Sequence, residues 1–278
     1  MKKEVNSLDT WSFLYTPDLT PAMNMALDES LMKWHREKKI APVLRFYTWS
    51  PAGLSVGHFQ KTDGRISKEG VSEHQVDIVR RLTGGRAVLH DDELTYSVII
   101  AEDHPMIPNT VKEAYLVLSE GLMKGYSRLG IEAEYAIPEE ERMNNQSAVC
   151  FEEPSWYELT IHGKKAAGSA QVRQKGVLLQ HGSIPIRTDE AKLFDMFTYP
   201  SERVKERAKN GFKHKAVSIE DAMDEEVTVE YVHDAFLQGF REGLEVAFEP
   251  LELTKDDWKE VEALAETKYA SDEWNLKR

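Results

Sequence analysis

Cysteine is almost absent from this chain of 278 residues, which has only one, so no disulfide can form within it. Such scarcity suits a reducing compartment, and we expect a cytoplasmic protein. Long hydrophobic runs are also missing: no apolar stretch approaches the ~20 residues that span a bilayer, so we expect no membrane association. Acidic residues outnumber basic ones, and the net charge of −13 argues against a general affinity for nucleic acid.

The chain also lacks internal repeats, low-complexity tracts and any linker rich in Pro, Gly or Ser. With 41% hydrophobic and 30% charged residues, its composition is typical of a globular protein that buries a sizeable core. We therefore expect one catalytic domain over residues 1–250, followed by a helical C-terminal extension, residues 251–278, of the same unit.

Hydrophobic periodicity and turn residues place the expected elements along the chain. Strand-like runs lie at 11–16, 43–49, 54–57, 77–82, 94–101, 131–137 and 177–186, with a hairpin at 156–165. Helices are expected from Pro21, from the capping residue Thr110 to about residue 129, and at 189–197, 228–244 and 254–268. Because the strands group with hairpin-like connections and the helices sit apart, we expect an α+β protein.

A paired glycine, Gly84-Gly85, joins two strand-like runs, with Arg80-Arg81 before it and His90-Asp91 after it. Glycine lacks a Cβ atom, so its backbone can adopt positive φ and lie against a ligand. For the two glycines alone, a tight turn beside a surface ion pair would be the favoured interpretation. The functional interpretation, a binding site, depends instead on the match of the whole segment to a known motif.

The whole segment resembles the glycine-rich motif RRxxGGGxVxHD of the lipoate-protein ligase and octanoyltransferase superfamily, with Arg86 in place of the third glycine. A second stretch, from Gly163 to Ala170, is similar to the superfamily element GKKxxGSA, whose lysine points into the acyl pocket. Counted back from Gly168, that lysine is Lys165 and not Lys164. The resemblance implies the fold of biotin and lipoate transferases, a mixed sheet flanked by helices.

Further matches extend the resemblance over nearly the whole chain and favour the thioester-using octanoyltransferases of the superfamily. They lie at residues 21–29, 149–151, 154–159, 180–184, 199–204 and 266–269. The resemblance implies transfer of octanoyl from acyl carrier protein to a lysine of the glycine-cleavage H protein or another lipoyl domain, for lipoate biosynthesis. It also implies that the transfer passes through a thioester on Cys150, with Lys165 as the second catalytic residue.

Cys150 follows a polar, charged loop and precedes the hairpin that carries Lys165. A free thiol of pKa ~8.5 is only about 3% thiolate at pH 7, and a neighbouring ammonium favours the charged form. The hypothesis is that Cys150 is the nucleophile and that Lys165 lowers its pKa. The alternative is a buried structural thiol beside a hairpin with ordinary surface lysines.

The acyl donor decides whether ATP is needed. A free acid must be activated by ATP, usually with Mg²⁺, whereas a thioester is already activated. Ligases of the superfamily carry a third glycine where Arg86 stands and typically Gly-Asn where Asp92-Glu93 follow, so we expect neither ATP nor a metal. Arg86 could instead bind a phosphate. An ATP-dependent lipoate-protein ligase therefore stays an alternative, as do a lipoyl amidotransferase and a non-catalytic acyl-binding protein.

Other residues of these motifs are candidates for binding substrate. The two arginines are expected to stabilise an oxyanion or hold the phosphopantetheine arm, or else to form structural ion pairs. Backbone N–H groups near the glycines are candidates for an oxyanion hole. The two histidines are either general bases or structural residues, so neither is assigned as the base. These candidates are Arg80, Arg81, Gly84, Gly85, His90, Gly168, Ser169 and His181.

Residues 201–216 differ from the rest of the acidic chain. They hold six basic residues against two acidic ones, Glu202 and Glu206, which gives a net charge of +4. Because acyl carrier protein is acidic, we expect this segment to bind it; a solvated helix face is the alternative. The basic residues are Arg203, Lys205, Arg207, Lys209, Lys213 and Lys215.

Overall fold

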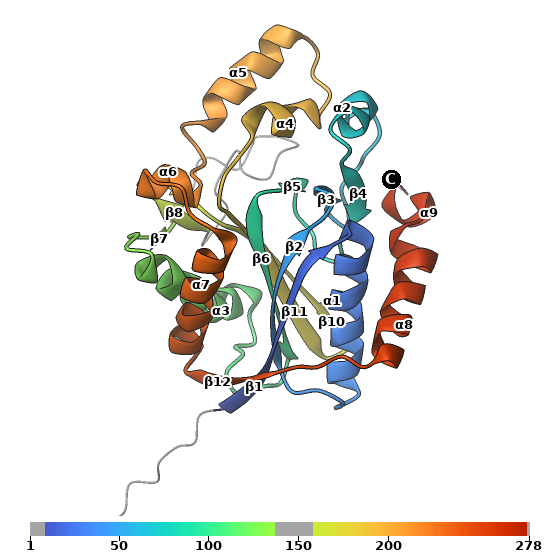
Figure 1. The fold of residues 1–278 in the computed structure, drawn as a ribbon, viewed down its shortest axis with the longest axis vertical. Helices are drawn as coiled ribbons and strands as arrows, with labels where there is room; N and C mark the ends of the chain where they lie inside the picture. Colours follow the sequence, from blue (N-terminus) through green and yellow to red (C-terminus); the bar gives the residue numbers. More distant parts are fainter. Residues whose placement is uncertain (1–8, 137–157, 277–278) are drawn as a thin grey trace, which may run out of the picture.

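The computed structural model describes residues 9–136 and 158–276. Its centre is a six-stranded mixed sheet with the strand order β10-β11-β6-β2-β1-β12 (Figure 1). Strands β10, β11, β6 and β2 run antiparallel in succession, whereas β1 is parallel to both β2 and β12. The bounds are β1 Asp9–Leu19, β2 Val43–Trp49, β6 Glu93–Ala101, β10 Gly168–Gln174, β11 Val177–Pro185 and β12 Val246–Pro250.

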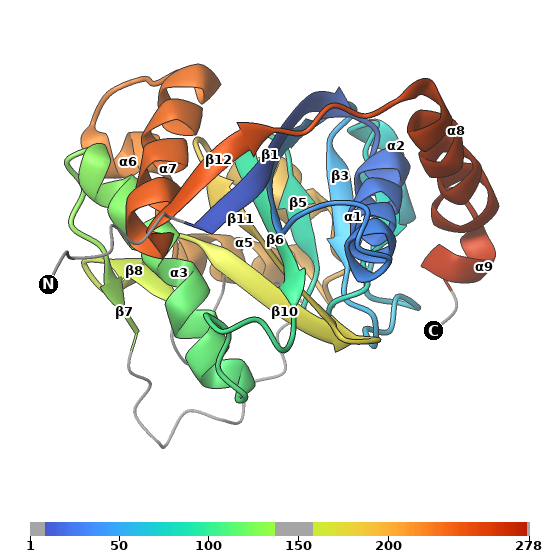
Figure 2. The same ribbon diagram turned by 90° about the horizontal axis from the view of Figure 1, so that it is seen from below.

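Helices cover both faces of this sheet, and Figure 2 shows them on its two sides. One face packs against α3 (Val111–Arg128) and α7 (Val229–Leu244), the other against α1 (Pro21–Arg36), α8 (Lys255–Leu264) and the π-helix η2 (Ala265–Tyr269). Side chains alternate between the faces of a strand. In β2, Phe46 therefore packs with α3 and α7, while its neighbour Tyr47 packs beneath α1.

Local sequence sets the starts of the long helices α1 and α3. The Thr20 hydroxyl accepts a hydrogen bond from the Met23 N–H at 3.3 Å, and Pro21 occupies the first helical position of α1. Thr110 caps α3 in the same way, through the Glu113 N–H at 3.2 Å. Both helix starts expected from the sequence are confirmed.

Two small sheets extend the central one. The first has the order β4-β3-β5 and packs against α4 and the end of α5, which bury Leu193 and Phe212. The second has the order β7-β8-β9, and its hairpin turns through His162 and Gly163, both with positive φ. The strand bounds are β3 Gly53–Val56, β4 Asp77–Arg80, β5 Val88–His90, β7 Glu134–Tyr135, β8 Leu159–Ile161 and β9 Lys164–Lys165. The remaining helices are α2 Lys68–Glu73, α4 Glu190–Asp195, α5 Glu202–Phe212, α6 Ile219–Met223 and α9 Asp272–Asn275.

The expected α+β class, with a mixed sheet flanked by helices and helices at the C-terminal end, is confirmed. The strand expected at 131–137 was too long, because only Glu134–Tyr135 is a strand among its described residues. The helix expected at 254–268 is divided between α8 and η2. The proposed domain boundary at residue 250 stays a prediction. Across the described ranges, every helix is too short or too polar to cross a bilayer.

Candidate active site

The expected nucleophile, Cys150, lies outside the described residues. The other candidate residues fall into three places. Arg81, Gly84, His90 and His181 are joined by hydrogen bonds, the two histidines through Ser55 and Thr83. Lys165, Gly168 and Ser169 follow one another through β9 and β10, and Arg80 is buried against the C-terminal helix α9.

Arg81 follows the last residue of β4, and its buried guanidinium organises the glycine turn. It donates to the carbonyl oxygens of Gly84 and Arg86, at 2.7 and 2.8 Å. It also donates to the carbonyl and hydroxyl oxygens of Ser55, at 2.9 and 3.1 Å, and to the Thr83 hydroxyl at 3.2 Å. A guanidinium has five N–H groups, and these contacts match that number. Arg81 therefore fixes the turn from within, and its expected contact with substrate stays a prediction.

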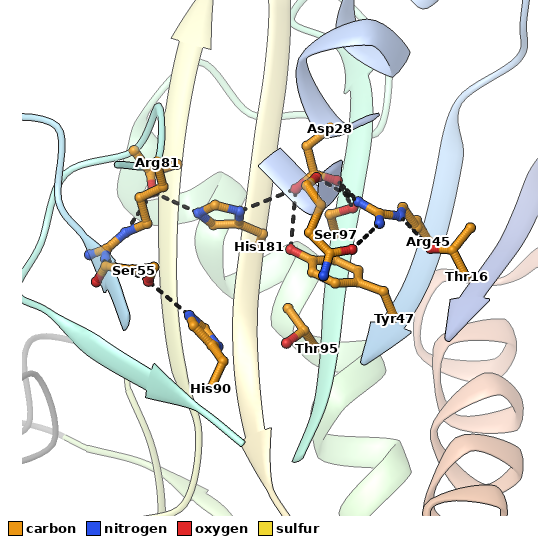
Figure 3. A network of polar contacts seen from close by, with 12 residues as sticks. Thr16, Asp28, Arg45, Tyr47, Ser55, Arg81, His90, Thr95, Ser97 and His181 are labelled. Atoms are coloured by element: carbon orange, nitrogen blue, oxygen red, sulfur yellow. Dashed lines mark hydrogen bonds and ion pairs between the residues drawn. The ribbon is translucent and has the colours of Figure 1, made fainter. Parts of the chain in front are cut away.

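One chain of hydrogen bonds runs from Arg81 through Thr83 to His181 and Asp28 (Figure 3). The Thr83 Oγ1 atom lies 2.7 Å from Nε2 of His181, and Nδ1 of that ring lies 3.4 Å from Oδ2 of Asp28. The arrangement is consistent when the neutral ring accepts from Thr83 and donates to Asp28. Burial lowers the pKa of His181, which outweighs the opposing effect of the Asp28 carboxylate.

Asp28 lies on the side of α1 that faces the sheet, and its carboxylate accepts hydrogen bonds from side chains on three neighbouring strands. His181, Ser97 and Arg45 are register neighbours on β11, β6 and β2. The Ser97 hydroxyl donates to Asp28 Oδ1 at 2.9 Å, and Arg45 Nη1 donates to the same oxygen at 2.7 Å. Burial alone would raise the pKa of Asp28, but the Arg45 charge and the contact with His181 hold it below its usual value. Asp28 is therefore a buried carboxylate anion.

A second chain of the same kind runs from Arg81 through Ser55 to His90 and Glu93. The Ser55 hydroxyl lies 2.8 Å from Nε2 of His90, and Nδ1 of His90 lies 2.7 Å from Glu93 Oε1. The imidazole stacks on the Trp49 ring with a centroid distance of 4.1 Å. Burial would raise the pKa of Glu93, but His90 and the hydroxyl donors lower it overall. Both ring nitrogens of His90, as of His181, thus have partners within the protein.

The glycine turn is closely packed on one side and open on the other. A Cβ atom built on Gly57 would lie 2.0 Å from the carbonyl oxygen of Gly85, so these backbones touch. Gly85 has φ of +97°, a conformation that glycine adopts without strain. A Cβ atom on Gly84 would meet nothing within 4 Å. Within 9–136 and 158–276, the N–H groups of Gly84 and Gly85 donate to no acceptor, as an oxyanion site requires.

Arg80 is fully buried and ties distant backbone segments together. Its Nη1 atom donates to the carbonyl oxygens of Gly57 and Gln60, at 2.6 and 2.9 Å. Its Nη2 atom donates to the carbonyl oxygen of Asn275 at 2.9 Å. These contacts support the structural interpretation of Arg80, although with carbonyl groups as partners. The expected role in substrate binding stays a prediction.

Lys165 is a wholly buried lysine at the end of β9. Its Nζ atom donates to Glu158 Oε1 at 2.6 Å, and its side chain has no solvent exposure. The backbone is fixed on its other side by the segment after α5, because Lys165 N–H donates to the Lys215 carbonyl at 2.8 Å and Val217 N–H donates to the Lys165 carbonyl at 3.0 Å. Buried lysines almost always have a partner. The alternative of an exposed surface lysine is therefore wrong for Lys165.

Gly168 and Ser169 are the first two residues of β10, which pairs with β11, the strand that carries His181. The Tyr96 hydroxyl donates to Ser169 Oγ at 2.8 Å, and Gly182 on β11 pairs with Ser169 in register. A Cβ atom on Gly182 would lie 2.6 Å from Ser169 Oγ and 2.7 Å from the Tyr96 ring. Burial raises the pKa of Tyr96 to about 12, so its hydroxyl stays protonated and can act as a donor. The motif residue Gly182 thus lets the Tyr96 ring approach β10.

Sequence reasoning missed the groups that orient the histidines and the lysine. Asp28, Glu93 and Glu158 are buried carboxylates, and none had a predicted role. One signal was present: Arg45 is the one charged residue of a mostly apolar strand, and such a residue needs a buried partner. In the described ranges, no cluster of three or more His, Cys, Asp or Glu side chains is arranged to hold a metal ion.

Comparisons with known proteins bear on the family and the fold. Octanoyltransferase LipM of Bacillus subtilis (strain 168) is 55% identical over 275 residues, which cover 97% of this chain and 99% of that protein. The solved lipoate protein ligase of Thermoplasma acidophilum superposes with a TM-score of 0.78 at 22% identity, over 96% of both chains. A lipoate-protein ligase A bound with ATP gives 0.75 at 24% identity, over 97% of this chain and 99% of the other. At such identities, the two structures bear on the fold alone.

Residues 20–241 match the family model of the lipoyl protein ligase A/B catalytic domain, a range that includes every candidate site residue described above. This chain therefore belongs to the lipoyl protein ligase A/B catalytic domain family.

Proposed function

We propose that the protein transfers octanoyl from acyl carrier protein to a lysine of a lipoyl domain, such as that of the glycine-cleavage H protein, through a thioester on Cys150. The octanoyltransferase activity itself, in lipoate biosynthesis, follows from the 55% identity to a named octanoyltransferase over nearly the full length of both chains. The donor, the acceptor and the residue roles are the proposal.

In the first step, the Cys150 thiolate attacks the carbonyl carbon of the donor thioester. The bond to the carrier sulfur breaks, and the carrier thiol leaves with a proton. In the second step, the amine of the acceptor lysine attacks the Cys150 thioester, an amide forms, and the cysteine thiol is released. A covalent intermediate divides one transfer into two accessible steps. Because the acyl group arrives as a thioester, neither ATP nor a metal is required.

The observation that carries the residue assignment is the complete burial of Lys165. A buried ammonium costs free energy unless its charge is paired, and Glu158 supplies one partner at 2.6 Å. An ammonium can donate three hydrogen bonds, and in the proposal Lys165 stabilises a thiolate or a thioester oxygen in addition to its contact with Glu158. Glu158 stands only eight residues after Cys150. So short a connection is compatible with an approach of the nucleophile to the same side chain.

The glycine turn supplies a second element of the proposal. In the proposal, the N–H groups of Gly84 and Gly85, which have no acceptor within the described residues, stabilise the oxyanion as charge develops on the acyl oxygen. Arg81 holds the turn in place through the Gly84 and Arg86 carbonyls. The binding energy of such donors is realised only if the turn is preorganised, and five contacts to one guanidinium provide that order.

Intact-protein mass spectrometry tests the mechanism and the residue together. The wild-type protein, incubated with octanoyl-acyl carrier protein, should gain the mass of one octanoyl group, and a Cys150→Ser variant should gain no thioester. Cys150 is the only cysteine, so a thioester has no other site. A donor-dependent transfer to the lipoyl domain without this intermediate would overturn the proposed route.

The alternatives give different results in the same system. An ATP-dependent ligase would use free octanoate only when ATP is present. A lipoyl amidotransferase would accept an octanoylated or lipoylated H protein as its donor in preference to the carrier. A non-catalytic acyl-binding protein would gain no covalent mass from any thioester.

A further inference from the structure

Helix α5 concentrates positive charge on an acidic protein. Six basic and two acidic residues lie between 201 and 216, although the whole chain has a net charge of −13. Two of the cations fasten the helix to its neighbour α4. Lys205 pairs with Asp195, and Lys213 Nζ lies 3.4 Å from Glu190 Oε2. These two ion pairs help to hold α5 in place on the molecule.

The other four cations of residues 201–216 do not hold α5 to α4. Arg203, Arg207 and Lys215 are exposed and Lys209 is half-buried, and no carboxylate in the described part of the chain forms an ion pair with any of the four. Elsewhere on the surface, cations such as Lys192 and Arg187 have carboxylate partners. Unpaired cations create a positive potential that acts over about 8 Å at physiological salt.

An apolar stripe lies between these cations. Val204, Ala208 and Phe212 follow one another at helical i, i+4 spacing. Phe212 is buried against β3 and β5, Ala208 is partly buried there, and Val204 is 44% exposed. The stripe therefore leaves the core and reaches the surface between Arg203 and Arg207. An exposed apolar residue framed by arginines is the composition of a protein interface, with an apolar centre and a charged rim.

The chain connects this surface directly to the candidate site. Helix α5 is about 16 Å long at 1.5 Å per residue, and the chain leaving it reaches Lys215 and Val217, which hydrogen-bond to the backbone of Lys165. In Figure 1, α5 lies at the upper end of the molecule next to α4. The backbone thus links the C-terminal end of α5 to Lys165 within a few residues.

We propose that Arg203, Val204, Arg207 and Lys209 of α5 form the docking surface for the acidic acyl carrier protein, an inference that rests on the proposed function. Charge complementarity selects an acidic partner. The length of the arm that carries the reacting group favours the donor, and not the acceptor, as the partner of α5. The donor presents its thioester on a flexible phosphopantetheine arm and can dock away from the reacting atoms. The acceptor lysine has a stem of only four carbons, so the acceptor domain must contact the rim of the site itself.

A double charge reversal tests the proposal, with two donors compared. The test variant is Arg203→Glu with Arg207→Glu, and both Lys205 and Lys213 are left intact to hold the helix. The control variant is Arg36→Glu with Lys38→Glu, two exposed cations of which the first is the last residue of α1 and the second lies just beyond its end. Both variants change the net charge by the same amount. The donors are octanoyl-acyl carrier protein and octanoyl-pantetheine, which has the reactive thioester but no carrier surface.

The test variant should raise KM for the carrier donor by about tenfold or more and make it less sensitive to salt, because rim charges act mainly on encounter. Its kcat and its kinetics with octanoyl-pantetheine should stay within about twofold of wild type. Equal loss with both donors, an unchanged KM for the carrier, or the same effect in the control variant would overturn the docking surface. A raised KM for the lipoyl domain alone would assign α5 to the acceptor. Absence of transfer from both donors by the wild-type protein would instead contradict the proposed function.

Discussion

Thr83 Oγ1 lies 2.7 Å from Nε2 of His181, although 98 residues separate them in the chain. The contact completes a chain from Arg81 to Asp28 in which each group donates to the next. A parallel chain leads from Arg81 through Ser55 to His90. Each chain thus links the Arg81 guanidinium through a hydroxyl and an imidazole to a buried carboxylate, which is Asp28 in the first chain and Glu93 in the second. The histidines have the hydrogen bonds of fixed structural groups around the glycine turn.

His181 should make the stability of the protein depend on pH between 7.5 and 5.5. Burial keeps its folded-state pKa below the unfolded value of ~6.5, so the unfolded chain binds more protons in this range. The stability contribution is complete above pH ~6.5 and is lost as pH falls from there through the lower folded pKa. The free energy of unfolding in urea, measured at pH 7.5, 6.5 and 5.5, should therefore decrease.

Replacement of the ring tests that assignment. His181→Gln should lose about 1–3 kcal/mol of stability at pH 7.5, because Thr83 and Asp28 lose a well-placed partner, and should show a smaller decrease towards pH 5.5. His214→Gln, at an exposed position, should retain the wild-type pH dependence. An unaltered pH slope in His181→Gln would contradict this account of the buried ring.

Gly57→Ala should disturb the glycine turn although Gly57 is not part of the glycine-rich motif itself. The new Cβ would lie 2.0 Å from the Gly85 carbonyl oxygen, and backbone cannot move aside as a flexible side chain can. Overpacking of this kind costs about 1–3 kcal/mol, and the rate of acyl-enzyme formation should fall because the donors of the turn shift.

Gly84→Ala is the matched comparison within the turn. Its Cβ meets nothing within 4 Å, so the melting temperature should stay close to wild type. If an acyl substrate lies against this backbone, the rate of transfer should still fall by about tenfold. Normal transfer by Gly84→Ala would remove Gly84 from the substrate-binding residues.

Sequence patterns predicted those helices and strands that are determined by interactions between residues close together in the chain. The apolar run Val43–Trp49 is a strand with the expected bounds, and Thr20-Pro21 starts a helix as predicted. The parallel pairing of β1 with β12 was not predicted, because those strands lie more than 200 residues apart. Such pairing depends on tertiary contacts that have no local sequence signature.

The residues of the candidate site can be divided in the same way, into those close together in sequence and those brought together only by the fold. The glycine turn and Lys165 stand in compact motifs, so their neighbours in sequence are also neighbours in space. Asp28 and His181 are 153 residues apart, and an isolated aspartate in an amphipathic helix looks like any solvent-facing residue. Only Arg45 carried a clue, since a charge in a buried strand implies a buried partner. The sequence thus supplied the groups proposed to act on substrate, and the structure supplied those that hold them.

Asn275→Ala should destabilise the protein from its C-terminal helix. The Asn275 side chain accepts from the Arg80 N–H at 2.8 Å and donates to the Tyr269 carbonyl at 2.7 Å. Loss of both contacts leaves buried backbone groups unpaired and should cost about 1–3 kcal/mol, seen as a lower melting temperature. Glu273→Ala, at an exposed position of the same helix, should melt like wild type. Equal melting of the two variants would show that Asn275 does not fasten α9 to β4.

Lys165→Met separates the structural role of the lysine from its catalytic one. The substitution removes a charged partner of the buried Glu158 carboxylate and should cost about 3–5 kcal/mol. The double variant Lys165→Met with Glu158→Gln removes both charges and should recover much of that stability in urea unfolding. It should not recover the octanoyl adduct on Cys150, because no ammonium is left to stabilise the thiolate. Acylation of the double variant at the wild-type rate would show that Lys165 serves the fold alone.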